Sequence, residues 1–137
     1  MPLRPALTFA GNAESALAHY SAALGGNPEI VRFGGTPAEK DVPAQWSSKV
    51  LYGALHSPYG DVSVMDAPPG REGTPGDNFA IAIDLDDEQK AIDVFDKLSA
   101  AGAVLMPFEK TFFAQKFGMA TDKFGVRWMV SVRPGMN

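Results

Sequence analysis

Few side chains in this sequence could do acid–base or metal chemistry, because it has two histidines and no cysteine. His19 lies beside Tyr20 on a predicted helix and is expected on the surface of that helix. His56 lies near the turn of a predicted hairpin, where it could reach a pocket or remain in solvent. Asp66 ends a strand before two prolines, so it could face a cavity or start a turn. Asp84 lies in an apolar strand, where a buried carboxylate would need a partner.

The aromatic side chains favour binding over catalysis. Phe112 and Phe113 lie on a connector between predicted strands and are the better candidates for a lid. Lys116 and Arg127, on the second predicted hairpin, could hold an anion or could be ordinary surface charges. We expect further pocket aromatics among residues that could instead be core: Phe9, Trp46, Tyr52, Phe79 and Trp128.

An internal repeat organises the elements that must position these side chains. An apolar stripe with helical spacing starts at Ala16 and recurs at Ala91, and each helix then meets glycine. An aromatic-glycine pair, Tyr59-Gly60 and then Phe124-Gly125, marks a hairpin turn in each copy. The sequence therefore predicts two βαβββ modules, at about 1–67 and 78–133, joined by a Pro- and Gly-rich linker at about 68–77.

The element boundaries follow from periodicity and from capping residues. We expect strands over 3–10, 29–33, 49–57 and 61–66 in the first module, with a helix over 13–24 whose N-cap is Asn12. In the second module we expect strands at 78–85 and 103–108, a helix from Asp86 or Asp87 to about 101, and the hairpin within 117–132.

Composition excludes several classes of protein. The chain has 137 residues, a net charge of −4 and ordinary globular composition. It has no basic stripe for nucleic acid, no apolar run long enough to span a membrane, and no recognisable signal peptide. We therefore expect a cytoplasmic protein of one domain whose fold class is α+β, with no nucleic-acid or membrane partner.

Four phrases carry a resemblance that covers nearly the whole chain: LTFAGNAESALAHYSAALGG, KVLYGALHSPYGDVSVMDAPPG, FDKLSAAGAVLMPFEKTFFAQKFG and TDKFGVRWMVSV. They resemble the vicinal oxygen chelate superfamily, which includes glyoxalase I, extradiol dioxygenases and bleomycin resistance proteins. Within it, the chain is most similar to the PhnB-like branch, also labelled demethylubiquinone methyltransferase-like. The resemblance implies tandem modules whose curved mixed sheet surrounds a cupped pocket, usually in a homodimer. No glycine-rich turn typical of methyl-donor binding accompanies that label.

The resemblance also implies where a catalytic metal would bind. Its ligand positions correspond to Pro5, Ser63 or Met65, Asn78 or Phe79, and Met129 in this sequence. These side chains offer neither imidazole nor carboxylate, so we expect no metal centre of the usual kind and no other cofactor. Met65 and Met129 instead join the predicted ligand pocket. The branch often has a histidine where this chain has Tyr52, which weakens any inherited acid–base role.

The sequence is consistent with three functions. The first is a small-molecule binding protein with an aromatic-lined cup, for which an acidic chain favours a cationic or neutral ligand. The second is a metal-dependent lyase, isomerase or dioxygenase. The third is a metal-free enzyme that uses Tyr52, His56 or Asp66.

Overall fold

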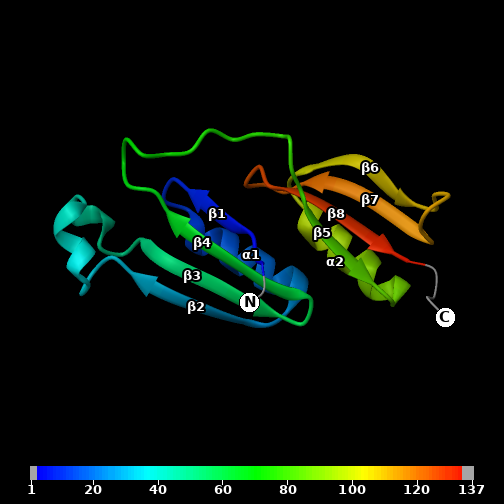
Figure 1. The fold of residues 1–137 in the computed structure, drawn as a ribbon, viewed down its shortest axis with the longest axis horizontal. Helices are drawn as coiled ribbons and strands as arrows, with labels where there is room; N and C mark the ends of the chain where they lie inside the picture. The colour runs from blue at the N-terminus through cyan, green and yellow to red at the C-terminus, as the bar shows by residue number, and fades with distance from the viewer. Residues whose placement is uncertain (1–2, 134–137) are drawn as a thin grey trace. The chain divides into compact units, whose positions relative to one another are not determined.

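A computed structural model describes residues 3–133 of the chain. It divides into two compact units, Met1–Thr74 and Pro75–Asn137. Each unit has a four-stranded sheet and one helix, and these can be followed in Figure 1.

The first unit contains the elements β1 (Ala6–Phe9), α1 (Ala13–Leu24), β2 (Asn27–Arg32), β3 (Val50–Ser57) and β4 (Gly60–Asp66). Two short 3₁₀ turns, Pro37–Asp41 and Ala44–Trp46, occupy the long loop before β3. The strand order is β1-β4-β3-β2, with β1 parallel to β4 and the other pairs antiparallel. The first strand is shorter than the predicted 3–10, and Pro5, which has no N–H to donate, directly precedes it.

The second unit repeats this plan with β5 (Ile81–Leu85), α2 (Glu88–Ser99), β6 (Ala103–Glu109), β7 (Lys116–Thr121) and β8 (Arg127–Val132). Its strand order is β5-β8-β7-β6, again with a parallel pair between the first and last strands. The predicted βαβββ repeat is therefore confirmed. Neither helix has the length and hydrophobicity needed to cross a membrane, within the residues that the structure describes.

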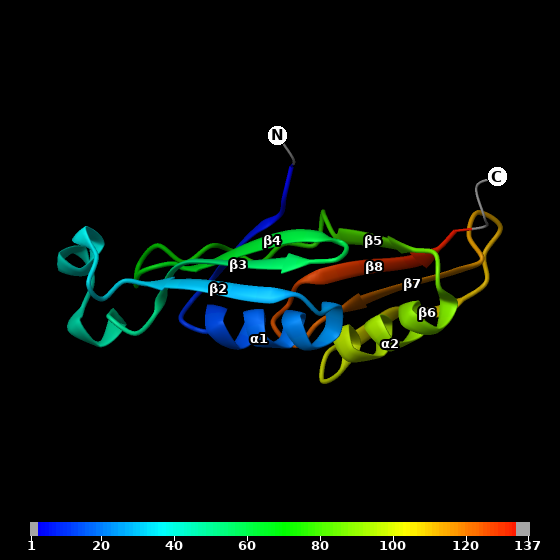
Figure 2. The same ribbon diagram turned by 90° about the horizontal axis from the view of Figure 1, so that it is seen from below.

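Each helix covers one face of its own sheet (Figure 2). Strand residues alternate between the two faces, so one set of side chains packs under the helix. In the first unit that set includes Leu7, Leu55, Val62 and Val64, and in the second it includes Ile83, Leu85, Trp128, Val130 and Val132, all buried. The helices contribute buried side chains that include Leu17 and Tyr20 from α1 and Val94, Phe95 and Leu98 from α2.

The glycines after the helices have the same structural role in both units. A Cβ on Gly26 would lie 2.2 Å from the carbonyl oxygen of His56, and one on Gly102 would lie 2.1 Å from that of Thr121. Only glycine permits so close an approach of the helix exit to the neighbouring strand. The predicted glycine stops therefore reflect backbone packing that recurs in each copy.

The two hairpin turns join equivalent strands but differ in length. Ser57 pairs with Gly60 across the first turn, whereas Thr121 pairs with Arg127 across the second. The longer turn closes around the buried Asp122, whose Oδ1 accepts hydrogen bonds from the backbone N–H of Phe124 (2.8 Å) and Val126 (3.0 Å).

The extra length shifts the repeat by one residue. Gly118 lies 65 positions after Gly53, whereas their partners Val130 and Val64 lie 66 positions apart. Consequently Met65 corresponds to Ser131 in the second unit, and Ser63 corresponds to Met129.

Asn12 is the N-cap residue of α1, as predicted, but the side chain of Asp66, rather than its own, satisfies the N–H groups at the start of this helix. The Asn12 side chain makes no capping hydrogen bond. Oδ1 of Asp66 instead accepts from the N–H groups of Gly11 and Ala13, both at 2.9 Å, and Oδ2 accepts from that of Val50 at 3.0 Å. The second helix fits the prediction, since the Asp87 side chain accepts from the N–H of Lys90.

Replacing Asp66 with asparagine should destabilise the chain. Asp66 is 1% exposed, and an amide group turns an NH₂ toward at least one backbone donor that now has an acceptor. We expect Asp66→Asn to lower the free energy of unfolding by roughly 2–3 kcal/mol, measured by urea denaturation. The exposed Asp41→Asn change, in the same unit, should stay within about 0.5 kcal/mol of wild type. Equal stabilities for the two variants would contradict this role of Asp66.

Candidate functional site

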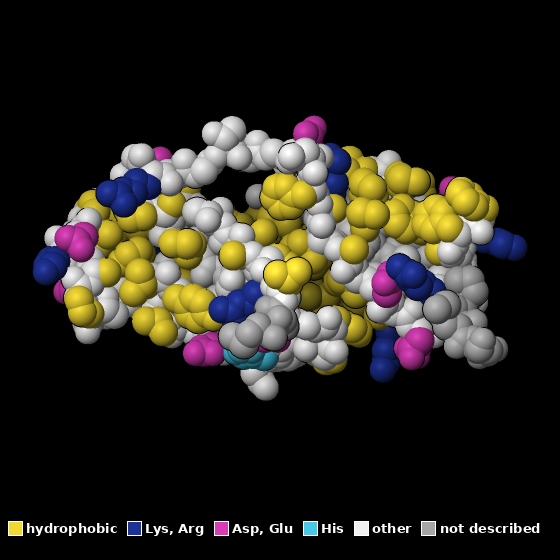
Figure 3. All heavy atoms as spheres, viewed as in Figure 1, with side chains coloured by type: hydrophobic (Ala, Val, Ile, Leu, Met, Phe, Trp, Pro, Cys, Tyr) yellow, Lys and Arg dark blue, Asp and Glu magenta, His cyan; other side chains and the backbone are white. Residues whose placement is uncertain are grey.

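The candidate binding surfaces are the sheet faces that the helices leave uncovered. In Figure 1 each helix lies behind its own sheet, so the space-filling view in Figure 3 looks onto these surfaces. We call each surface the helix-free face of its unit. Both faces carry hydrophobic side chains.

The helix-free face of the first unit carries a row formed by Thr8, Met65, Tyr52 and Val31, on four neighbouring strands. Met65 and Val31 are each about two-fifths exposed. The Arg4 guanidinium carbon lies 5.8 Å from the centre of the Tyr52 ring, within the range of a cation–π contact. Two predicted pocket residues, Tyr52 and Met65, therefore lie side by side on this face.

His56 lies on the same face and contacts a carboxylate on either side. Its Nε2 is 3.0 Å from Oε2 of Glu29 on β2, and its Nδ1 is 3.1 Å from Oδ2 of Asp61 on β4. The hydrogen bond to Glu29, and then that to Asp61, raise the pKa of His56 above its ordinary value. The sequence analysis did not anticipate these partners, because only strand pairing brings the three residues together.

Other predicted site residues of the first unit lie elsewhere. Phe9 and Asp66 are buried on the side of the sheet that α1 covers. Trp46 lies in the second 3₁₀ turn, where its ring packs edge-on against Phe33 with centroids 6.3 Å apart. Asp66 has a structural role, since its carboxylate binds three backbone N–H groups.

A hollow of about 240 Å³ lies beside the start of α1. Its charged lining residues are already paired: Arg32 contacts both carboxylate oxygens of Glu14, at 2.7 and 3.0 Å, and the Lys49 ammonium donates to the carbonyl of Gly11. It is therefore a weaker candidate site than the helix-free faces.

The helix-free face of the second unit carries a row of methionines. Met106, Met119 and Met129 lie opposite one another on β6, β7 and β8. Gly118 shows which face of the sheet α2 covers, because a Cβ on Gly118 would lie 2.7 Å from the Phe95 ring of α2. Met119, the next residue, therefore faces away from the helix. Met106 is 43% exposed, and the other two are partly exposed.

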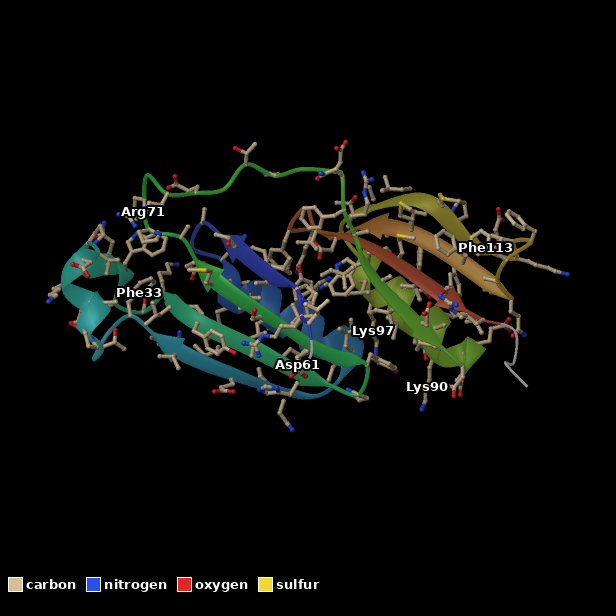
Figure 4. All side chains as sticks on the ribbon, in the orientation of Figure 1. Phe33, Asp61, Arg71, Lys90, Lys97 and Phe113 are labelled. Atoms are coloured by element: carbon tan, nitrogen blue, oxygen red, sulfur yellow. The ribbon has the colours of Figure 1, made fainter. Side chains whose placement is uncertain are left out.

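Phenylalanines border the methionine row at one end. Phe113 is labelled in Figure 4 in the connector between β6 and β7, and its ring packs edge-on against Phe117 with centroids 5.1 Å apart. Phe113 is half exposed, whereas Phe117 is buried. Phe112 contacts Phe113 but is otherwise exposed, and Phe79 lies exposed before β5. Trp128 is different: it is 1% exposed under α2, and its Nε1 donates to Oδ2 of Asp122 at 2.9 Å.

Polar side chains lie at the two ends of this face. At one end Asp84 accepts a hydrogen bond of 2.5 Å from the Ser131 hydroxyl and forms an ion pair of 3.1 Å with Arg133. Asp84 therefore has the partners that a carboxylate in an apolar strand needs. At the other end Arg127 lies two residues before Met129 on β8, so both side chains project from the same face.

Sequence reasoning identified Met129, Phe113 and Arg127 but missed Met106, Met119 and Phe117. These three follow from strand register, and the sequence alone left that register one residue uncertain. The irregular spacing of β6, where the pairing shifts between Val104 and Met106, hid the alternation further.

The side chains at the positions implied for a metal do not fit one. Met65 and Met129 lie on helix-free faces and offer thioethers, and Ser63 has its hydroxyl directed to the Pro5 carbonyl at 3.3 Å. No group of three or more histidine, aspartate or glutamate side chains within residues 3–133 is arranged to hold a metal ion. We therefore derive no chemistry through a metal at this site.

Comparisons with known proteins agree with this architecture. The chain is 32% identical over 142 residues to Protein YjdN of Escherichia coli K12, covering 96% of this chain and 95% of that protein. Among solved structures, protein PA1353 from Pseudomonas aeruginosa has a TM-score of 0.86 and 33% identity, covering 97% of this chain and 98% of that one. A structure from Bacillus cereus, named as a putative 3-demethylubiquinone-9 3-methyltransferase and PhnB protein, has a TM-score of 0.73 and 25% identity, covering 96% and 99%.

A family model covers most of the chain and decides its classification. The model of the Glyoxalase/Bleomycin resistance protein/Dioxygenase superfamily matches residues 4–130. Together with the repeated βαβββ topology, this match shows that the chain belongs to the Glyoxalase/Bleomycin resistance protein/Dioxygenase superfamily.

Proposed function

We propose that this chain is a cytoplasmic small-molecule binding protein that holds an apolar ligand against its helix-free sheet faces without a metal ion. The observation that carries the proposal is the row of Met106, Met119 and Met129, which lies on the helix-free face of the second unit and stays partly open to solvent.

The chemistry of the row suits binding. A methionine side chain is flexible and polarisable, so neighbouring methionines can adapt to ligands of different shape and contact aromatic rings favourably. Phe113 and Phe117 extend the apolar surface beside them. An apolar surface with a few polar groups at its margins is the usual composition of a ligand site.

Metal-dependent catalysis is the alternative within the superfamily. A lyase, isomerase or dioxygenase of that kind needs a divalent ion to polarise its substrate. The thioether, hydroxyl and amide groups at the implied positions bind such ions poorly. Binding without catalysis therefore fits this donor set better.

A metal-free enzyme is the other alternative, and its candidate residues are already engaged. Both ring nitrogens of His56 contact carboxylates, and the Asp66 carboxylate accepts three backbone hydrogen bonds. Tyr52 lies on the helix-free face, where Arg4 lies over its ring and no acid–base partner contacts its hydroxyl within residues 3–133. These arrangements favour structural and binding roles for the three residues.

The binding proposal predicts that a neutral apolar probe binds at the methionine row. We expect N-phenyl-1-naphthylamine to gain fluorescence with wild-type protein and to shift the methyl signals of Met119 and Met129 in a spectrum of ¹³C-methyl methionine. Met119→Glu should weaken binding by at least about tenfold, because it places a carboxylate within the apolar contact. Val104→Glu, on the same sheet but the other face, should not.

The same titration tests independence from metal. Chelator, or added Zn²⁺, Ni²⁺, Fe²⁺ or Mn²⁺, should change the affinity for the probe by less than about twofold, because no metal ion takes part in the proposed contact. Loss of binding after chelation would contradict the metal-free proposal, and saturable binding without methionine shifts would place the ligand elsewhere.

The contacts of His56 predict a pH dependence. Its folded-state pKa is raised by Glu29 and Asp61, so the stabilisation is fully present below the pKa of the unfolded chain and is lost as pH rises through the folded pKa. A titration of the imidazole signals by NMR should give His56 a pKa above about 6.5. Glu29→Gln should lower that pKa and Asp61→Asn should lower it less. A pKa unmoved by Glu29→Gln would show that the contact does not persist in solution.

We further propose that the protein is a homodimer. Each sheet has two edge strands, and β2 and β6 are mostly exposed along their length. Open edges favour pairing with another chain. Sedimentation equilibrium at micromolar protein should give twice the chain mass of 14.6 kDa, and a single species at the chain mass would overturn the proposal.

A further inference from the structure

We propose that the ligand of the second unit carries an oxyanion head group, such as a carboxylate, sulfonate or phosphate, and that Arg127 binds this group while the apolar body lies on the methionine row. This inference rests on the proposed binding function and specifies the class of ligand.

Arg127 lies at one end of the methionine row. It lies opposite Thr121 on β7, one alternation before the pair Met119 and Met129, so its side chain emerges beside the methionine row. Residues two apart along a strand are separated by roughly 6.5–7 Å. A head group held by Arg127 would therefore leave an attached ring system directly over the methionines.

Arg127 is hydrogen-bonded on one side of its guanidinium. Its Nη1 donates to the backbone carbonyl of Asp77 at 3.0 Å, which fixes one side of the guanidinium. Within residues 3–133, no carboxylate lies within salt-bridge distance of Arg127, whereas Arg32 and Arg133 each have one. A guanidinium with further N–H groups is suited to bidentate binding of an oxyanion.

Carboxylates lie toward the other end of this face. Asp84 shares the helix-free face, but its carboxylate is compensated by Arg133 and by the Ser131 hydroxyl. Glu109, which pairs with Phe117, is on the same face but lies four residues along β7 from the partner of Arg127, roughly 13 Å away. The charge nearest the Arg127 end of the methionine row is therefore positive, although the whole chain has a net charge of −4. Nearby charge dominates binding because screening weakens distant charges beyond about 8–10 Å.

A matched pair of probes isolates the head group. 8-Anilino-1-naphthalenesulfonate and N-phenyl-1-naphthylamine share one ring skeleton, and only the first carries a sulfonate. We expect wild-type protein to bind the sulfonate at least about tenfold more tightly than the neutral probe, the range of a charge-assisted hydrogen bond. Arg127→Gln should remove this preference and leave the affinity for the neutral probe within about twofold.

Two further variants control for charge and folding. Lys116→Gln removes one positive charge from the same sheet, but Lys116 lies over the Phe108 ring on the side that α2 covers, so it should keep the preference. Arg127→Lys retains the charge without the planar fork and should keep part of it. Unchanged affinity of each variant for the neutral probe shows that the face is intact.

The outcomes separate the two proposals. If both probes bind equally and Arg127→Gln changes neither, the oxyanion inference is overturned and the binding function stands. If neither probe binds and Met119→Glu converts a dimer into monomers, the face is an interface with a second copy and both proposals fail. A selective loss of sulfonate binding in Arg127→Gln supports the inference.

Discussion

The first unit depends on one buried carboxylate that joins three segments distant in sequence. Asp66, at the end of β4, holds the backbone between β1 and α1 through Gly11 and Ala13, and the start of β3 through Val50. A buried charge is tolerated only where hydrogen bonds replace its lost hydration. Two of the three donors, the N–H groups of Gly11 and Ala13, lie at the start of α1, where backbone N–H groups have no acceptor within the helix. These groups therefore need the carboxylate as their acceptor. Asp66 therefore fixes the start of α1 relative to the strands of its own sheet.

The second unit also has a buried carboxylate with three hydrogen-bond donors, that of Asp122. Asp122 closes the turn between β7 and β8 through Phe124 and Val126 and anchors the buried indole of Trp128. The longer turn that it requires shifts β8 by one position relative to the first unit. That shift places a methionine, Met129, on the helix-free face where the first unit has Ser63. The difference between the two faces therefore originates in the turn.

The sequence predicted the fold well because its signals are local. Helical stripes, the glycines that contact neighbouring strands and the aromatic-glycine turns each require only nearby residues, and they recur in order. The site was less predictable because it depends on pairing between strands. Nothing near Met119 indicates that it lies between Met106 and Met129, and the extra turn residue reverses the face that a simple copy of the first hairpin would give. Asp66 was identified as notable, but its three backbone donors are separated from it by 16 to 55 positions.

Net charge was an equally coarse guide to the ligand. An acidic chain favours cationic or neutral ligands if its charges act together, but here several charges on the helix-free faces are paired. Glu29 and Asp61 flank His56, and Asp84 is bound to Arg133. Paired charges contribute little field at a distance, so a single arginine beside an apolar row can set the preference there. The methionines would then determine how broad a range of ring systems is accepted, because they adapt their shape, and the arginine would determine which of those molecules is held in one orientation.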